Sequence, residues 1–138
     1  MYLYKTDVSL LSVLRPASMS VLLQRSTSAA REHLRVATYG IVKQLDGQVE
    51  GVLPVAVQGY TATVLGAYSL HGADASAHWS CIREMLELFA SEIGGSTARV
   101  VLPAGPDSGL SEEAKLFVQC GFVVEELGPA ETRLVLGA

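Results

Sequence analysis

Charged side chains are scarce in this chain of 138 residues. Asp, Glu, Lys and Arg make up 17% of the sequence, whereas an average soluble domain carries about 25%. Hydrophobic residues reach 49%, so the composition excludes a disordered chain and predicts extensive burial. Part of that burial is expected in a homo-oligomer or a larger assembly, because one domain of this size does not need so little charge. The net charge of −4 excludes generic binding to nucleic acid or to an anionic membrane.

Cysteines and long apolar segments are also scarce. Cys81 and Cys120 form no CxxC pattern, and no secretory leader opens the sequence, so we expect a reduced, cytoplasmic protein. The segment from Gly51 to Ala73 lacks charged residues, but Pro54 and several polar residues interrupt it, which argues against a membrane helix. No internal repeat or linker divides the chain, and residues 1–138 are therefore predicted to form one domain.

Strand and helix signals alternate along the chain. Strands are predicted at residues 2–6, 35–44, 49–57, 60–70, 99–102, 122–127 and 133–136. Helices are predicted at 8–14, 18–25 and 75–93, and between Ser111, as N-cap, and Gly121. Short turns at Asp46-Gly47 and Gln58-Gly59 make the second to fourth strands an antiparallel meander. The order β-α-α-β-β-β-α-β-α-β-β indicates an α/β protein with a mixed central sheet of six to seven strands flanked by helices.

The helix predicted over residues 75–93 is amphipathic, with its apolar positions on one face. These positions are Ile82, Met85, Leu86, Phe89 and Ile93. A helix that links two strands of one sheet usually makes a parallel crossover, which places strand 99–102 beside or close to the last strand of the meander. Pro54 in the second meander strand requires an edge position or a bulge, and Gly66 in the third indicates a bulge or a close approach to the backbone.

One local motif stands in the second half of the chain. Leu116 and Phe117 are followed, after three residues, by Gly121-Phe122 at the start of a strand. Together with the element order, this segment resembles the GCN5-related N-acetyltransferase (GNAT) superfamily, in which an aliphatic-Tyr pair, three variable residues and Gly-Phe stand at this place. The resemblance implies a GNAT-like fold and the transfer of an acetyl or other acyl group from coenzyme A to an amine.

The resemblance also implies where acetyl-CoA or another acyl-CoA would bind. The coenzyme would lie between strands 60–70 and 97–102, with strand amides around Gly66 to Ser69 holding the thioester carbonyl. Its pyrophosphate would lie in the loop before the long helix. The implied coenzyme-binding residues are Gly66, Ala67, Ser69, Leu70, Gly72, Ala73, Ser76 and Phe117.

Two positions depart from the family pattern. The loop before the long helix lacks the family's basic residue, and Asp74 adds negative charge where phosphate would lie; alternatively, Asp74 or Ser76 is a plain N-cap. Phe117 replaces the tyrosine that commonly protonates the leaving thiolate, and a phenyl ring has no proton to donate. Strand 60–70 has no carboxylate base either. His71 and Tyr68 are therefore the candidate catalytic residues, although a histidine at a strand end is commonly a surface or capping residue.

The remaining polar residues give weaker indications. His33, His71 and His78 lack a metal-ligand spacing, so no metal site is predicted. Trp79 is either a core residue or the rim of a pocket. Four arginines precede the meander, and they either receive an acidic or phosphorylated partner or are simply solvated. These four are Arg15, Arg25, Arg31 and Arg35.

Three functions therefore remain open. The first is an acyl-CoA-dependent N-acyltransferase, which requires the third meander strand to part from the strand after the long helix and leave a V-shaped slot. The second is a catalytically silent GNAT-like module with a binding or structural role in an assembly, for example a phage particle. The missing basic loop residue, the missing tyrosine and the low charge favour it. The third is an acyltransferase-like enzyme that takes a donor other than coenzyme A.

Overall fold

The computed structural model describes residues 2–5, 32–33, 35–45, 48–69, 71, 74–92, 97–105 and 109–137. The helices predicted at 8–14 and 18–25 and the turn predicted at Asp46-Gly47 lie outside these residues. The expectation of one domain over residues 1–138 stays a prediction.

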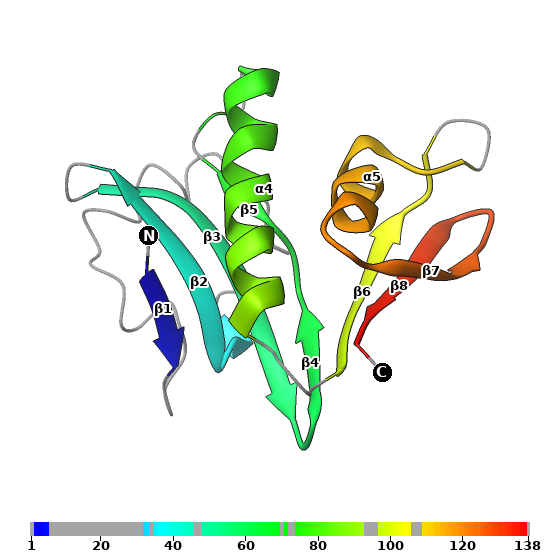
Figure 1. Cartoon of the computed structure of the whole chain (residues 1–138), viewed down its shortest axis with the longest axis horizontal. Helices are drawn as coiled ribbons and strands as arrows, with labels where there is room; N and C mark the ends of the chain where they lie inside the picture. Colours follow the sequence, from blue (N-terminus) through cyan, green and yellow to red (C-terminus); the bar gives the residue numbers. More distant parts are fainter. Residues whose placement is uncertain are drawn as a thin grey trace.

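The strands of the described part form one mixed sheet (Figure 1). They are β1 (Tyr2–Lys5), β2 (Tyr39–Leu45), β3 (Gln48–Gln58), β4 (Thr61–Val64), β5 (Tyr68–Ser69), β6 (Thr97–Pro103), β7 (Val123–Leu127) and β8 (Glu131–Leu136). Seven of them run in the order β1-β2-β3-β4-β6-β8-β7, and β5 pairs with β3. Among the strands of the described residues, only β4 and β6 pair in parallel, and the other pairs are antiparallel. The predicted mixed α/β sheet and the predicted parallel crossover are therefore confirmed.

Two helices, α4 (Ala75–Glu92) and α5 (Glu112–Gln119), lie on the same face of this sheet (Figure 1). A hydrogen bond of 2.8 Å from Arg83 of α4 to Gln119 of α5 joins them. The apolar face predicted for α4 is buried at Ile82, Met85, Leu86 and Phe89; Ile93 lies outside the described residues. Trp79 is partly buried and packs against this core. No helix of the described part is both long enough and apolar enough to span a membrane.

The meander differs from its prediction in two places. Its first strand begins at Tyr39 rather than at residue 35, because Arg35 and Val36 are helical and Arg35 pairs with Glu32 one turn earlier. The third predicted strand, 60–70, is two strands, β4 and β5, with an interruption between them. The turn predicted at Gln58-Gly59 lies one residue later, because Gln58 still pairs with Thr61 and the two-residue loop consists of Gly59 and Tyr60. Gly59 has a φ of +62° that side-chain-bearing residues rarely adopt.

The end of α5 explains the motif around Gly121 in physical terms. The N–H of Gly121 bonds to the carbonyl of Val118, and the N–H of Phe122 bonds to that of Phe117. Gly121 has a φ of +107°, so these bonds form a Schellman motif with glycine at its left-handed position. The rings of Phe117 and Phe122 then meet edge to face, with centroids 5.0 Å apart. At the other end Ser111 is the N-cap, as predicted, and its Oγ accepts from the N–H of Ala114.

Candidate functional site

The strands β4 and β6 pair over only part of their length. Thr61 to Val64 pair in parallel with Thr97 to Val100, and we call these residues the closed half of the site. Beyond them β6 continues through residues 101–103 with β8 as its partner, while the chain after β4 turns to β3. We call residues 65–69 and 101–103 the open half. The two strands diverge visibly at this point (Figure 1), which is the parting that acyl transfer requires.

A β-bulge causes this divergence. Val55 pairs with Val64 and Val52 pairs with Tyr68, so two residues of β3 lie opposite residues 65–67, one more than regular pairing allows. Pro54 is one of those two, and its carbonyl accepts from the N–H of Leu65 at 2.9 Å. Because the nitrogen and carbonyl of a strand residue face the same neighbour, the missing N–H of Pro54 faces the bulge. The bulge predicted from Pro54 and Gly66 is therefore present.

The bulge leaves backbone donors without partners. Within the described part of the chain, no hydrogen bond is made by the N–H of Gly66 or of Ala67. Unpaired N–H groups at a strand interruption can hold a carbonyl oxygen or an oxyanion. Gly66 and Ala67 belong to the residues predicted to bind the coenzyme, and Ala67 packs partly against the core.

Ser69 lies one residue after Tyr68 in β5 and joins two histidines. Its Oγ forms a hydrogen bond of 2.5 Å with Nδ1 of His78 and accepts from the N–H of His71 at 3.2 Å. Burial, and then the neighbouring His71, lower the pKa of His78, so the neutral imidazole is favoured. The bonds tie the end of β5 to the first turns of α4.

His71 forms part of a second polar chain. Its Nε2 donates to Oε1 of Glu50 at 2.7 Å, and Lys43 contacts the other oxygen of that carboxylate at 3.3 Å. Lys43 also pairs with Glu84 of α4. Burial alone raises the pKa of Glu50, but the hydrogen bonds from His71 and Lys43 outweigh it, and the net pKa lies below its usual value. Lys43 and Glu50 were not predicted as site residues, because they lie within strand-forming segments of β2 and β3 and carry no motif.

Asp74 occupies the start of α4. Its Oδ1 accepts from the N–H of Ala77 at 3.1 Å, which makes it the N-cap that was predicted as one alternative. Ser76 is exposed in the first turn of α4. The carboxylate of Asp74 therefore uses one of the helix donors that would otherwise be available to a pyrophosphate. Leu70, Gly72 and Ala73, also predicted to bind the coenzyme, lie outside the described residues.

Two residues of α5 lie one helical turn apart. Phe117 is fully buried, so it helps to form the core beneath the site, and its contact with a coenzyme stays a prediction. Glu113 is partly buried, and burial raises its pKa. The charge of Glu113 in turn raises the pKa of Tyr68, after the larger effect of burial on that phenol. No sequence motif indicated Glu113.

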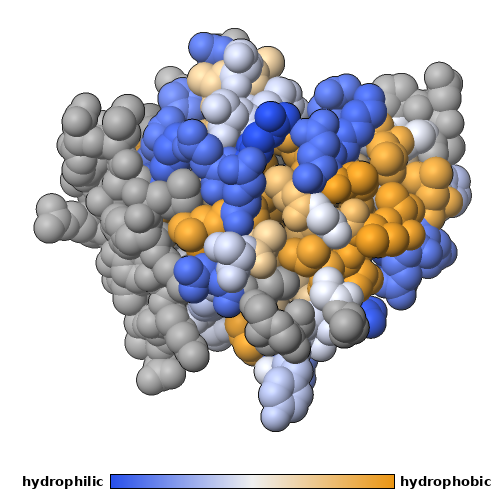
Figure 2. Space-filling model, in the orientation of Figure 1, coloured by the Kyte–Doolittle hydropathy of each residue, from blue (hydrophilic) through white to orange (hydrophobic). Residues whose placement is uncertain are grey.

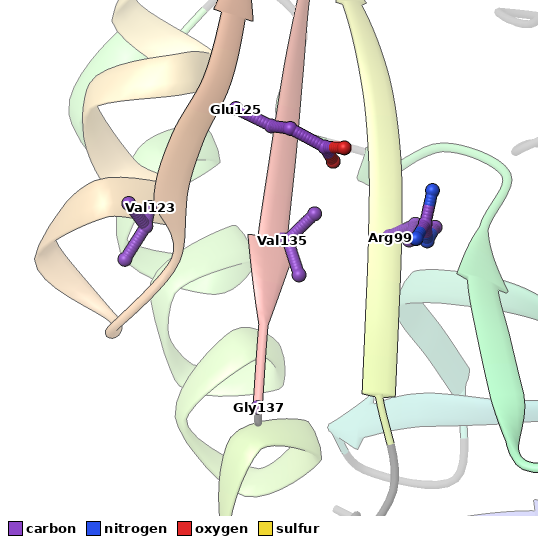
Figure 3. A pocket seen from close by; sticks show the side chains of 5 residues that line it. All are labelled: Arg99, Val123, Glu125, Val135 and Gly137. Atoms are coloured by element: carbon purple, nitrogen blue, oxygen red, sulfur yellow. The ribbon is translucent and has the colours of Figure 1, made fainter.

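A separate hollow of about 320 Å³ is lined mainly by residues of β6, β7 and β8. Figure 3 shows Arg99 of β6, Val135 of β8 and Glu125 of β7 around it. Val123 and Gly137 complete the lining. Arg99 belongs to the closed half, so this hollow is distinct from the place where the strands part. Among the described residues, no group of three or more His, Cys, Asp or Glu side chains could hold a metal ion.

Solved structures of other proteins have a similar backbone fold. The aminoglycoside 6'-N-acetyltransferase from Enterococcus faecium is similar with a TM-score of 0.68 and 8% identity, over 99% of this chain and 96% of that one. The chain has the GNAT fold. The ribosomal-protein-S18-alanine N-acetyltransferase from Escherichia coli is also similar, with a TM-score of 0.64 and 12% identity over 98% of this chain and 92% of that one.

A third GNAT structure was solved with a ligand. It is an aminoglycoside 6'-N-acetyltransferase complexed with coenzyme A, similar with a TM-score of 0.65 and 10% identity over 98% of this chain and 96% of that one. No protein-family model matches the sequence, and no curated protein matches it. The likeness is therefore one of backbone, and the resemblance inferred from the element order and the Gly121-Phe122 segment is confirmed at the level of the fold.

Proposed function

We propose that this chain transfers an acyl group from an acyl-coenzyme A to an amine. The observation that carries the proposal is the parting of β4 and β6 directly after the bulge at residues 65–67. A slender pantetheine arm needs a slot between strands, and its thioester needs donors for the carbonyl. In the open half, the end of the β4–β6 pairing and the N–H groups of Gly66 and Ala67 are the features that support these two roles. The GNAT structure complexed with coenzyme A supports the assignment through its similar backbone.

The proposed chemistry is direct attack. The amine nitrogen forms a bond to the thioester carbon, the carbonyl oxygen becomes an oxyanion, and the carbon–sulfur bond then breaks. The N–H groups of Gly66 and Ala67 stabilise the oxyanion, and one such donor is commonly worth about 10²- to 10³-fold in rate. Positioning the two substrates supplies much of the remaining acceleration. No covalent intermediate with the protein is required.

Isothermal titration with acetyl-CoA tests the binding step, and release of free thiol in the presence of a panel of amines tests the transfer. We expect micromolar binding of acetyl-CoA and amine-dependent thiol release. Acetyl-pantetheine, which lacks the pyrophosphate and nucleotide, is the matched ligand. Tighter binding of this shorter donor than of acetyl-CoA would support a donor other than coenzyme A, since Asp74 already caps α4.

A catalytically silent module is the second candidate. Asp74 at the start of α4 and the buried phenyl ring of Phe117 favour it, because neither residue can do what the family pattern requires. Hydrophobic residues also reach the surface over the part formed by α5, β7 and β8 (Figure 2), which suits an assembly. No heat with millimolar acetyl-CoA or acetyl-pantetheine, together with an oligomer in solution, would favour this role over the enzyme.

The location and the partners of the protein are predicted from its sequence. A cytoplasmic location and an oligomeric state stay predictions. The predicted basic region before the meander is described only at Arg35, which pairs with Glu32 at 2.9 Å, so a role for this arginine in binding an acidic partner would require it to leave that pair.

A further inference from the structure

The hydroxyl of Tyr68 lies against the bulge. A Cβ atom built on Gly66 would stand only 2.6 Å from Tyr68 Oη and 2.8 Å from its Cζ, closer than real Cβ contacts. The end of the phenol ring therefore occupies the space that a side chain at position 66 would take. This places the hydroxyl against the backbone of Gly66, one of the two residues whose N–H groups the proposed function assigns to the thioester carbonyl.

The same hydroxyl has a histidine partner. Nδ1 of His33 lies 2.6 Å from Tyr68 Oη, and the two ring centroids are 6.3 Å apart. His33 comes from a helical segment that precedes the meander, and both side chains are partly buried. The neighbouring charges of that segment, Glu32 and Arg35, pair with each other. Proximity of a phenol, an imidazole and a close-approach glycine makes this a built site rather than a surface contact.

We infer that Tyr68 is the proton donor of the acyl transfer and that His33 is its positioning residue, in place of the tyrosine that is absent at position 117. The inference rests on the proposed function. As the carbon–sulfur bond breaks, Tyr68 gives its proton to the sulfur. The phenolate then takes up the proton that the attacking nitrogen loses, while His33 holds the phenol in place. The proton lost by nitrogen and the proton gained by sulfur balance, and no further reactant is needed.

The surroundings favour an acid over a base at this position. Burial, and then the charge of Glu113 from α5, raise the pKa of Tyr68, so the phenol is protonated at neutral pH and can donate. Of the described groups, His33 and Glu113 are the titratable ones that act on this hydroxyl. His71, the other candidate from the sequence, has its Nε2 engaged with Glu50.

The first experiment removes only the hydroxyl. For Tyr68→Phe we expect kcat to fall about 10²-fold, as is typical of a lost general acid, with an unchanged Kd for acetyl-CoA by calorimetry. Tyr60→Phe is the matched control, because Tyr60 is 89% exposed in the β3–β4 turn. An active protein in which Tyr68→Phe retains the wild-type kcat, or in which His71→Asn alone reproduces the loss, would overturn the inference.

The second experiment tests whether His33 acts through Tyr68. His33→Ala should lower kcat about tenfold, and His33→Asn, which keeps a polar atom near the Nδ1 position, should recover much of that loss. The double variant His33→Ala with Tyr68→Phe should be no slower than Tyr68→Phe alone, because both changes remove one function. Additive losses would contradict the pairing. Wild-type protein that does not bind acetyl-CoA would instead refute the proposed function itself.

Discussion

The closed and open halves of the β4–β6 pair are built from the same two strands, yet they differ in almost every physical respect. In the closed half, Val64 and Val100 pair in register and their side chains are buried. In the open half, β6 and the chain after β4 do not pair with each other, and polar side chains bond to one another there: Tyr68 bonds to His33, and Ser69 bonds to His78. One extra residue at the bulge separates the closed half from the open half.

This difference shows how a stable sheet can contain an interruption that is available to a candidate site. Regular pairing in the closed half fixes the relative position of β4 and β6, so the parting begins at a defined residue. The helix α4 extends along both halves. Its N-terminal end, with Asp74 and His78, lies at the open half. Farther along the helix, Phe89 contacts Tyr39 of β2, which pairs with Val55; Val55 in turn pairs with Val64 of the closed half. Substitutions along one helix can therefore separate stability from chemistry.

The largest expected effect is a loss of stability when the core beside the closed half is changed. Phe89→Ala removes a fully buried ring and should lower the free energy of unfolding by about 3–5 kcal/mol, measured by urea denaturation. Glu87→Ala, at an exposed position of the same helix, is the control, and its effect should stay within about 0.5 kcal/mol. Similar losses from both variants would contradict the assignment of Phe89 to the core.

The next effect is on the rate in the open half. Gly66→Ala places a methyl group where the Tyr68 hydroxyl lies, so the ring must move and its bond to His33 is broken. We expect kcat to fall by up to about 10²-fold, since a misplacement of this size can cost that much, with little change in Tm. In the Tyr68→Phe background the same glycine change should have almost no further effect on kcat. A large loss there would assign Gly66 another role.

A smaller effect is expected at the start of α4. Asp74→Ala should cost about 1 kcal/mol of stability through the lost N-cap, yet it should tighten acetyl-CoA binding severalfold, because it removes a negative charge and frees the N–H of Ala77. Ser111→Ala, the N-cap of α5, should cost a similar amount of stability and leave the affinity unchanged. Equal affinities of the two variants would place the pyrophosphate away from α4.

The smallest effect concerns the chain of charges beside the open half. The pKa of Glu50 is lower in the folded protein than its usual 4.5, so the carboxylate adds stability at neutral pH, and this contribution disappears as the pH falls from 4.5 toward the folded-state pKa. Glu50→Gln should therefore lower stability at pH 7 by at most about 1 kcal/mol. The wild-type and variant Tm values should converge in acid; a difference that persists there would indicate a packing defect.

The elements that the sequence predicted correctly are those with a local physical signal. The 3.6-residue period of Ile82, Met85, Leu86 and Phe89 predicted the buried face of α4, and Ser111 and Gly121 predicted the ends of α5, since caps depend on neighbours in the chain. The bulge was predicted from Pro54 and Gly66 for the same reason. The strand expected at 60–70 was wrong as one piece, because a register shift depends on the partner strand.

The sequence by itself determined the order of most of the described elements, the apolar face of α4 and the bulge, because these follow from backbone preferences and periodicity within a few residues. Only the tertiary structure decided where the bulge directs the chain and which polar groups meet there. His33 and Tyr68 are 35 positions apart, and Glu113 comes from a helix later in the chain. Contacts between such distant residues depend on how the sheet and helices pack, so no local pattern could have indicated them.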